Sequence, residues 1–299
     1  MGISIQKRNK IMLTKPKISV CIPVYNGELT IEESVRSVMG QTFKDFEIVI
    51  TDDSPNDKSS RIIKSIKDER IHYFLNEKNL GCGGNLNEGM RKASCDLIFY
   101  LSQDDLLDKQ ALEKTYRAFC SDEMIGIVIR PYYWFQKSYK LPVRITKQFT
   151  KDKIVSIKSP YDMIANVIAL SDQVSGVGLR KKYIKSVFSN TPFIEMASVV
   201  CDVLKRAKVY ILKDNIVAVR IGDNGATSPK VYFNSPMIVW DDMLQKTYSE
   251  KEFENLKKYL VDHFIANNYI GLVQIKNYGT WIQLFREFYY MIKLRKSNL

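Results

Sequence analysis

The first part of the chain, to about residue 120, alternates between short apolar runs and segments with helical periodicity. Runs with the length and aliphatic content of buried strands occupy Lys17–Pro23, Phe46–Thr51, Ile71–Leu75 and Leu97–Leu101. Between them the pattern predicts helices from Thr30 to about Met39, over Asn56–Ile66 and over Gly84–Lys92. Thr30 and Glu33 have the spacing of a capping box that would start the first helix. Alternating strands and helices with short links predict an α/β fold, a mostly parallel sheet with helices on both faces.

The pattern after this region is less regular. The sequence after Asn224 becomes helical. We therefore expect an N-terminal tail at 1–16, a main domain at 17–222 and a C-terminal helical region at 223–299. Within the second part of the main domain, strand-like segments recur at Gly126–Arg130, Val209–Leu212 and Ile216–Arg220.

The composition is that of a globular protein from a reducing compartment. Hydrophobic residues make up 45% of the 299 residues, which is ordinary for a globular chain. The five cysteines are scattered, odd in number and without CxxC spacing, so neither a disulfide framework nor a zinc site is indicated. The start lacks the apolar core of a secretory signal, and no apolar stretch approaches the roughly 20 residues that span a bilayer. We expect a cytoplasmic protein.

The formal net charge of +12 restricts the partners of the chain. Such a charge attracts nucleic acid, an anionic membrane surface or phosphorylated substrates. No nucleic-acid-binding motif accompanies the basic residues. The charge therefore favours phosphorylated ligands or anionic lipid, and nucleic acid is not expected as a partner.

Two pairs of adjacent carboxylates follow predicted strands. Asp52 and Asp53 close the second strand, and Asp104 and Asp105 follow the fourth in LIFYLSQDDLLD. Open α/β sheets bind ligands at the carboxyl ends of their strands, so both pairs should open on the same edge. Oxygen ligands favour a hard cation such as Mg²⁺ or Mn²⁺, usually shared with a substrate phosphate. The ordinary alternative for the second pair is an acidic turn or a helix cap.

A glycine-rich segment, NLGCGGNLNEG at 79–89, lies between the third strand and a helix. It invites comparison with a dinucleotide-binding loop, but Leu86 stands where the third glycine belongs. The segment also follows the third strand and not the first. A dehydrogenase is therefore disfavoured, and the alternative role of the segment is a turn that caps the next helix.

Three segments together resemble family 2 glycosyltransferases of the GT-A fold. They are ISVCIPVYNGELTIEESVRSVMGQTFKDFEIVITDD (Ile18–Asp53), NLGCGGNLNEGMRKA (Asn79–Ala93) and LIFYLSQDDLLD (Leu97–Asp108). The first is the most specific, because its Pro-x-Tyr-Asn turn, QTF element and terminal acids occur in the order and at the spacing of the family. The resemblance implies an inverting glycosyltransferase with a nucleotide-binding half at 17–108 and an acceptor-side half at 109–222.

The resemblance also assigns a donor site. Its nucleotide-sugar-binding residues would be Pro23, Tyr25, Asn26, Asp52, Asp53, Asn79, Gly81, Asn87, Ser102, Gln103 and Asp104. Its metal ligands would be Asp104 and Asp105, which would hold Mn²⁺ or Mg²⁺. Two positions depart from the family. Ser102 stands where the Asp-x-Asp motif usually begins, and Leu86 stands where many members have an arginine near the diphosphate.

The catalytic base of such enzymes lies roughly 90 residues after the metal motif. Glu195 has this distance and is our first choice, with Asp202 second. An acceptor hydroxyl is a weak nucleophile, and a positioned carboxylate takes its proton as it attacks. The alternative role of Glu195 is an acid at a helix N-terminus that interacts with the helix dipole. Asp172–Arg180 (DQVSGVGLR) matches the acceptor side of the family, with a glycine-containing turn as its alternative.

The segment TWIQLFREFYYMIKLRK at 280–296 predicts an amphipathic helix. Such a helix could lie on an anionic membrane near a lipid-linked acceptor. Packing against the catalytic domain or a second subunit is the favoured alternative. The oligomeric state stays open.

The expected function is the transfer of a sugar from a nucleotide-diphosphate sugar to a hydroxyl of a saccharide or lipid-linked acceptor. Synthesis of a bacterial surface polysaccharide or glycolipid is the expected setting, by family analogy. A sugar nucleotidyltransferase is one alternative, but it would need a phosphate loop that VYNGE at 24–28 does not supply. A non-catalytic nucleotide-sugar-binding module is the other, because Ser102 weakens the metal motif.

Overall fold

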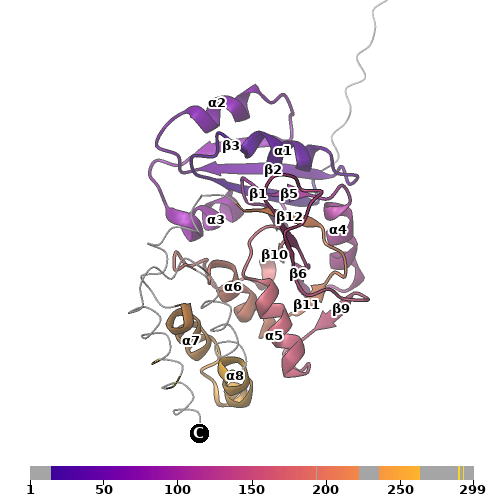
Figure 1. Cartoon of the computed structure of the whole chain (residues 1–299), viewed down its shortest axis with the longest axis vertical. Coiled ribbons are helices and arrows are strands. Elements are labelled where there is room, and N and C mark those ends of the chain that lie inside the picture. The colour runs from indigo at the N-terminus through magenta and orange to yellow at the C-terminus, as the bar shows by residue number, and fades with distance from the viewer. Residues whose placement is uncertain (1–14, 193, 222–235, 263–288, 290–291, 293–299) are drawn as a thin grey trace, which may run out of the picture.

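The computed structural model describes residues 15–192, 194–221, 236–262, 289 and 292, and every structural statement concerns these residues (Figure 1). Figure 1 shows α2 at one end of the molecule and α8 at the other. No helix among the described residues is long and apolar enough to cross a membrane.

The main sheet has eight strands in the order β3-β2-β1-β4-β10-β6-β11-β9. The predicted parallel sheet is confirmed where β1 pairs with β2 and β4, and β2 with β3. β10 differs, because it inserts between β4 and β6 in the antiparallel direction. The strands are β1 (Ile18–Val24), β2 (Phe46–Asp52), β3 (Ile71–Leu75), β4 (Leu97–Tyr100), β6 (Ile125–Ile129), β9 (Lys153–Val155), β10 (Gly178–Arg180) and β11 (Lys208–Ile211).

A second, four-stranded sheet has the order β5-β12-β7-β8. Its strands are β5 (Leu106–Leu107), β7 (Tyr133–Phe135), β8 (Arg144–Ile145) and β12 (Val217–Arg220). β5 begins directly after Asp105, so the second sheet starts at the predicted metal motif. β12 was expected from the sequence, whereas strands as short as β5 and β8 carry no readable periodicity.

Helices follow the strands as predicted in the first half of the chain. The α-helices of the described residues are α1 (Ile31–Met39), α2 (Lys58–Ser65), α3 (Gly81–Lys92), α4 (Ala111–Ser121), α5 (Tyr161–Leu170), α6 (Glu195–Leu204), α7 (Pro236–Thr247) and α8 (Glu254–Leu260). Short 3₁₀ turns are η1 (Lys181–Tyr183) and η3 (Lys251–Phe253). The predicted capping box is wrong. Thr30 makes no side-chain cap at α1, and the Glu33 carboxylate is instead bound by the Arg220 guanidinium at 2.5 Å.

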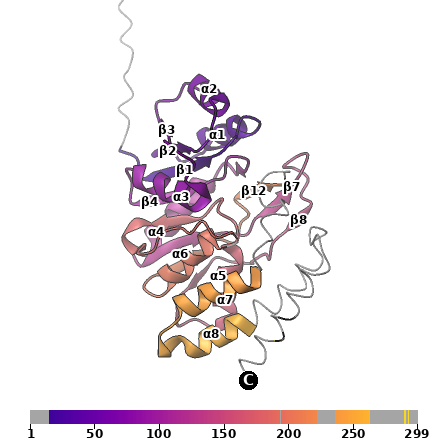
Figure 2. The same ribbon diagram turned by 90° about the vertical axis from the view of Figure 1, so that its left-hand side faces the viewer.

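The described part of the C-terminal region packs on the main domain. The rings of Tyr161 in α5 and Tyr259 in α8 lie 5.5 Å apart, and Leu244 and Leu260 are fully buried in the main core. Figure 2 shows α5, α7 and α8 beside one another. The predicted division at 222 stays a prediction. The predicted helix at 280–296 lies outside the described residues, apart from the exposed Tyr289 and Ile292.

Candidate active site

The carboxyl ends of β1, β2 and β4 meet at one edge of the main sheet. β1 lies between β2 and β4 and is parallel to both, with Val24 paired to Asp52 across the ladder. Asp53 follows β2 on this edge, and Asp104 and Asp105 follow β4. Both acidic pairs therefore follow strands that end at the same edge, as predicted, although Asp52 and Asp105 are buried there.

The turn after β1 is held by side chains from two other segments. Asn26 has φ 51°, in the left-handed region that asparagine tolerates better than most residues. Its backbone N–H donates to Ser54 Oγ at 2.8 Å. The Gln103 amide accepts from the Tyr25 N–H at 2.9 Å and donates to the Tyr25 carbonyl at 3.0 Å. Gln103 thus fixes the turn that begins at Pro23, which is partly buried at the end of β1.

Asp53 links β2 to the glycine-rich segment. Its carboxylate accepts hydrogen bonds from Asn76 Nδ2 at 2.7 Å and from the Leu80 N–H at 3.0 Å. Burial raises the pKa of Asp53 above its usual range, although these bonds oppose the shift. The carboxylate is therefore held in place at the start of α3.

Asp52 occupies a different environment from its neighbour. It is fully buried, and its two oxygens accept from the Ser54 N–H at 2.8 Å and from the Tyr73 hydroxyl at 2.9 Å. Successive side chains of a strand point to opposite faces, which accounts for the separation of Asp52 from Asp53. The contacts of Asp52 suit the support of the loop after β2.

Asp105 is a buried carboxylate that joins three segments. It accepts hydrogen bonds from Ser175 Oγ at 2.5 Å and from the Arg220 N–H at 2.8 Å. Ser175 Oγ also accepts from the Ser102 N–H at 2.8 Å. Burial, together with the charge of Asp104, raises the pKa of Asp105 to about 7. Both carboxylate oxygens are thus engaged inside the protein.

Asp104 is the more open carboxylate of the pair. Burial raises its pKa, but its side chain is only partly buried and its own backbone N–H donates to it. Among the described residues, no three His, Cys, Asp or Glu side chains gather as a ligand set. Protein-bound Mg²⁺ commonly uses one or two carboxylates and completes its shell with substrate phosphates and water. The position of Asp104 fits such a shared metal better than that of Asp105.

Arg220, the last residue of β12, is absent from the predicted site although it touches the acidic motif. Its Nε donates to the Asp104 carbonyl at 2.9 Å, and its guanidinium lies 4.6 Å from the centroid of the Phe135 ring. It is also the residue that binds Glu33. A cation at the end of the predicted strand 216–220 is the signal that could have identified it.

Arg130 is a second residue absent from the prediction. Its side chain is fully buried and donates to the backbone carbonyls of Leu170, Gln173 and Ser175. Burial lowers the pKa of Arg130 to about 10. Gly176, with φ +83°, packs so closely that a Cβ there would lie 2.6 Å from Arg130 Nε. The sequence offered no sign that this cation is internal, because most arginines lie at the surface.

The predicted acceptor-side segment at 172–180 lies beside this buried arginine. Asp172 accepts a hydrogen bond from the Tyr132 hydroxyl at 2.5 Å, and the Arg130 guanidinium lies 4.9 Å from the Tyr132 ring centroid. Burial raises the pKa of Asp172 even though its side chain reaches solvent. The same segment supplies Ser175, so it couples the acidic motif to the second half of the chain.

The glycine-rich segment is covered by a loop from the second half. Asn190 accepts from the Gly84 N–H at 3.0 Å and donates to the Leu80 carbonyl at 2.9 Å. At Gly83 a Cβ would collide with the backbone carbonyl of Ser189. The close approach of this loop therefore accounts for the glycine at position 83.

Asn87 completes the contact between α3 and this loop. Its amide donates to the Phe188 carbonyl and accepts from the Phe188 N–H, both at 3.0 Å. The side chain of Asn79 accepts from the Gly81 N–H at 2.8 Å at the start of α3. Of the residues predicted to touch the donor, Asn87 is thus fully engaged with the protein itself.

Glu195 begins α6 and lies near the glycine-rich segment. The loop that precedes it holds Asn190, whose side chain binds the Gly84 N–H and the Leu80 carbonyl. Through this loop the structure brings the start of α6 to the glycine-rich segment, whose Leu80 N–H binds Asp53.

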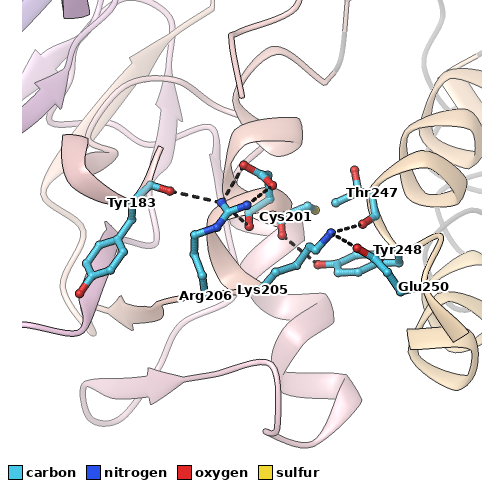
Figure 3. A network of polar contacts seen from close by, with 8 residues as sticks. Tyr183, Cys201, Lys205, Arg206, Thr247, Tyr248 and Glu250 are labelled. Atoms are coloured by element: carbon cyan, nitrogen blue, oxygen red, sulfur yellow. Dashed lines mark hydrogen bonds and ion pairs between the residues drawn. The ribbon is translucent and has the colours of Figure 1, made fainter. Parts of the chain in front are cut away.

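Asp202, about two turns further along α6, is held in an ion pair. Figure 3 shows the polar network around Lys205 and Arg206, at the end of α6. Arg206 Nη1 and Nη2 each lie 2.8 Å from an Asp202 oxygen, and Arg206 also donates to the Tyr183 carbonyl. Burial favours a higher value, but the bonds from Arg206 hold the pKa of Asp202 below its usual range. This pairing makes Asp202 a weaker candidate for the base than Glu195.

Comparison with known proteins places this arrangement in a family. The model of "Glycosyl transferase family 2" matches residues 19–173. A Campylobacter jejuni GalNAc(5)-diNAcBac-PP-undecaprenol beta-1,3-glucosyltransferase is 37% identical over 100 residues, which are 32% of this chain and 32% of that protein. Streptococcus pneumoniae glycosyltransferase GlyA is 31% identical over 129 residues, 42% of this chain and 18% of that protein. The match thus spans about a third or less of these relatives.

Solved structures agree on the architecture. S. aureus TarS in complex with UDP has a TM-score of 0.64 and 18% identity, over 85% of this chain and 72% of that chain. The mannosyltransferase PcManGT from Pyrobaculum calidifontis, solved with GDP-Man and Mn²⁺, has a TM-score of 0.56 and 13% identity, over 95% of this chain and 87% of that chain. The matched segment holds β1 to β4 and both acidic pairs, so the chain belongs to glycosyl transferase family 2 and has the GT-A fold.

Proposed function

We propose that the protein transfers a sugar from a nucleotide-diphosphate sugar to a hydroxyl of a saccharide or lipid-linked acceptor, with inversion at the anomeric carbon. The observation that carries the proposal is that Asp53 and Asp104 follow strands that end at one edge of the main sheet. The loop before Glu195 also contacts the glycine-rich segment, whose Leu80 N–H binds Asp53. Family membership supports it, as do neighbours solved with UDP and UDP-GlcNAc and a relative whose name describes a lipid-linked substrate. The product would be a surface polysaccharide or glycolipid.

The donor would lie along the carboxyl ends of β1, β2 and β4. The turn at 23–26 and Asp53 would border the base and ribose, because hydrogen bonds already hold them at the sheet edge. The diphosphate would then reach Asp104. An acidic residue after an early strand commonly accepts from a ribose hydroxyl in sheets of this kind.

Asp104 would hold Mn²⁺ or Mg²⁺ together with oxygens of the donor diphosphate. When bound, such an ion neutralises the charge that develops on the leaving group. Arg220 Nε lies 2.9 Å from the Asp104 carbonyl, so a fixed positive charge stands next to the same position. Asp105 would act indirectly, because Ser175 and the Arg220 backbone occupy its oxygens.

Glu195 would act as the general base. The acceptor oxygen forms a bond to the anomeric carbon, the bond from that carbon to the diphosphate oxygen breaks, and the hydroxyl proton passes to the Glu195 carboxylate. A single displacement of this kind inverts the configuration. The loop contact between Asn190 and the glycine-rich segment, just before Glu195, supports this role.

The decisive experiment is a screen of UDP- and GDP-sugars for nucleoside diphosphate release with saccharide and lipid-linked acceptors. Glu195→Gln should lower kcat about 10²- to 10⁴-fold, which is the usual contribution of a positioned base. Donor binding, measured by thermal shift, should be unchanged in this variant. Asp202→Asn is the matched control on the same helix, and it should keep most of kcat because Asp202 is paired with Arg206.

Two outcomes would contradict the proposal. Tight donor binding with no turnover of any donor would favour a non-catalytic binding module. A large loss of kcat in Asp202→Asn, with Glu195→Gln unaffected, would transfer the role of base to Asp202.

Metal use is tested separately. Asp104→Asn should abolish the part of the donor-induced thermal shift that depends on Mn²⁺ or Mg²⁺, since a ligand that binds the folded state raises apparent stability. Asp105→Asn should keep some of the metal-dependent shift. Equal shifts with and without a chelator in the wild-type chain would contradict a metal-assisted donor site.

A further inference from the structure

The β7–β8 hairpin, with the segment that follows it, is an acid-free basic stretch. No Asp or Glu occurs from Met124 to Lys151. We call residues 133–151 the basic hairpin. Its cations are Lys137, Lys140, Arg144, Lys147 and Lys151. Among the described residues none of these five makes an ion pair within 4.0 Å, whereas Arg36, Arg117 and Lys246 each pair with an acid four residues earlier on the same helix.

The same hairpin exposes large apolar side chains next to these cations. Leu141 is 70% exposed, Val143 57%, Ile145 53% and Tyr139 46%. Single exposed apolar residues are common, but neighbours along one hairpin indicate an interaction surface. Figure 2 shows β7 and β8 at the margin of the molecule, with the loop between them projecting from the main body.

The hairpin is anchored to the rest of the protein despite its exposed tip. The Val143 N–H donates to the Trp134 carbonyl at 2.8 Å, and the Arg144 guanidinium lies 4.0 Å from the Trp134 ring centroid. The Tyr132 and Trp134 rings pack edge to face at 4.7 Å. The apolar tip is therefore presented by a fixed base and not by a loose tail.

Cations that lack an acid partner, beside exposed aliphatic side chains, have the chemistry of a membrane interface. Anionic headgroups attract the basic side chains, while aliphatic groups enter the boundary between headgroups and acyl chains. A soluble anionic polymer would satisfy the cations but would leave Leu141, Val143 and Ile145 in water. We infer that the basic hairpin is a peripheral contact with the surface of a bilayer that contains anionic phospholipid.

The position of the hairpin gives this contact a role. β7 pairs with β12, whose last residue Arg220 binds the acidic motif, and β12 also pairs with β5 directly after Asp105. A bilayer held at β7 and β8 would thus lie against the same small sheet as the site. Delivery of a lipid-linked acceptor to that site is the one part of the inference that rests on the proposed function.

The test is sedimentation of the full chain with vesicles of 1:1 phosphatidylglycerol and phosphatidylcholine, compared with phosphatidylcholine alone. The wild-type chain should bind the anionic vesicles and not the neutral ones. A basic side chain at an anionic surface is worth about a fivefold change in affinity, so Lys137→Gln with Lys140→Gln should weaken binding about 25-fold. The control pair, Lys64→Gln with Lys67→Gln, removes the same charge from the end of the molecule where α2 lies.

A second pair of variants separates the membrane from other occupants. Leu141→Ser with Val143→Ser should weaken vesicle binding at least tenfold with the net charge unchanged, while Leu75→Ser, at a residue 61% exposed elsewhere, should have no effect. The inference is overturned if either hairpin pair binds vesicles like its control. It is also overturned if polyphosphate competes fully and the serine pair binds normally, which would indicate an anionic polymer.

The last alternative is that the basic hairpin binds a second copy of the chain. Loss of a dimer in Leu141→Ser with Val143→Ser, without vesicle binding by the wild-type chain, would assign the hairpin to a second copy and overturn the inference. All of these measurements omit the donor. A chain that transfers sugar to a soluble acceptor but ignores vesicles refutes the hairpin alone, and the reverse result refutes only the proposed function.

Discussion

The two halves of the main domain are held together in different ways. In the first half, β1, β2 and β4 are almost entirely buried and pair along continuous parallel ladders. In the second half the strands near the site are two to four residues long, and single hydrogen bonds, from the Ser175 hydroxyl and the Arg220 backbone N–H, connect them to the acidic motif. Many buried contacts along the ladders thus stabilise the first half. In the second half a few hydrogen bonds fix the positions of the site residues.

This difference separates stability from function. A conservative change inside a ladder removes a small part of a large apolar surface. A change at Arg130, Ser175, Asn190 or Arg220 removes a contact that no neighbour duplicates. We therefore expect polar residues of the second half to be more sensitive than similar residues of the first, and the following predictions test that contrast.

The largest effect is expected for Arg130→Met. The substitution leaves three buried carbonyls without their donor and takes a cation away from Asp172, which should lower the free energy of unfolding by about 3–5 kcal/mol. Arg36→Met is the control from the first half, since Arg36 pairs with Glu32 at the surface and is 60% exposed. It should cost about 1 kcal/mol or less. Urea unfolding measures both, and equal losses would contradict the contrast.

Asp105→Asn should change how stability depends on pH. The folded pKa of Asp105, about 7, lies above the ordinary value of 3.8, so its contribution is complete below about pH 4 and is lost as the pH rises through 7. The variant has no carboxylate to ionise at this position. Between about pH 4 and pH 7 its free energy of unfolding should therefore rise by a few kcal/mol relative to that of the wild-type chain. Unfolding free energies measured across the window test the sign.

Asp68→Asn is the control of opposite sign. Hydrogen bonds from Arg70 lower the pKa of Asp68, so its contribution is present above the unfolded pKa and is lost as the pH falls. The free energy of unfolding of the Asp68 variant should therefore fall relative to that of the wild-type chain as the pH rises through 4. If the unfolding free energies of the two variants depend on pH in the same way, the pKa of Asp105 is not raised in the folded state.

Gly83→Ala should destabilise the contact between the halves. The new methyl group would meet the Ser189 backbone and displace the loop that covers α3, at a cost of about 1–3 kcal/mol. Gly89→Ala in the same helix is the control, because the nearest atom to its Cβ would be 3.4 Å away. It should be neutral or stabilise by up to about 1 kcal/mol. Thermal unfolding measures both variants. A lower unfolding temperature for Gly89→Ala than for Gly83→Ala would contradict the close contact at Gly83.

The smallest effect is expected for Asn190→Ala. It removes the two hydrogen bonds to Gly84 and Leu80 and should cost about 1 kcal/mol of stability. Because the loop leads into α6, kcat should fall more than the affinity for the donor. An unchanged kcat together with the stability loss would mean that the loop supports the fold but does not position Glu195.

Much of the first half could be predicted from the sequence for a physical reason. Strands buried on both faces appear as continuous apolar runs, and the helices between them keep one apolar side. The same reasoning located Asp53 and Asp104 because the ends of parallel strands share an edge. It failed for the capping box, since Glu33 is bound by a residue 187 positions later.

The second half was less predictable because its contacts are distant in sequence and fall on ordinary polar residues. Ser175 reaches Asp105 across 70 positions, and Asn190 reaches Gly84 across 106. A serine or asparagine in a loop carries no periodic signal, and a two-residue strand carries none either. The roles of Ser175, Asn190 and Arg220 therefore required the structure.

The bond from the Arg220 backbone to Asp105 spans 115 positions and has a consequence for the growing chain. Ribosomes add about 5–20 residues each second, so Asp105 leaves the ribosome on the order of 5–20 seconds before its partner. During that interval the ladders of the first half can form, but the acidic motif lacks the donor that seats it. A nascent chain would thus form the parallel sheet of the first half early, and the acidic motif would be completed only after β12 has been synthesised.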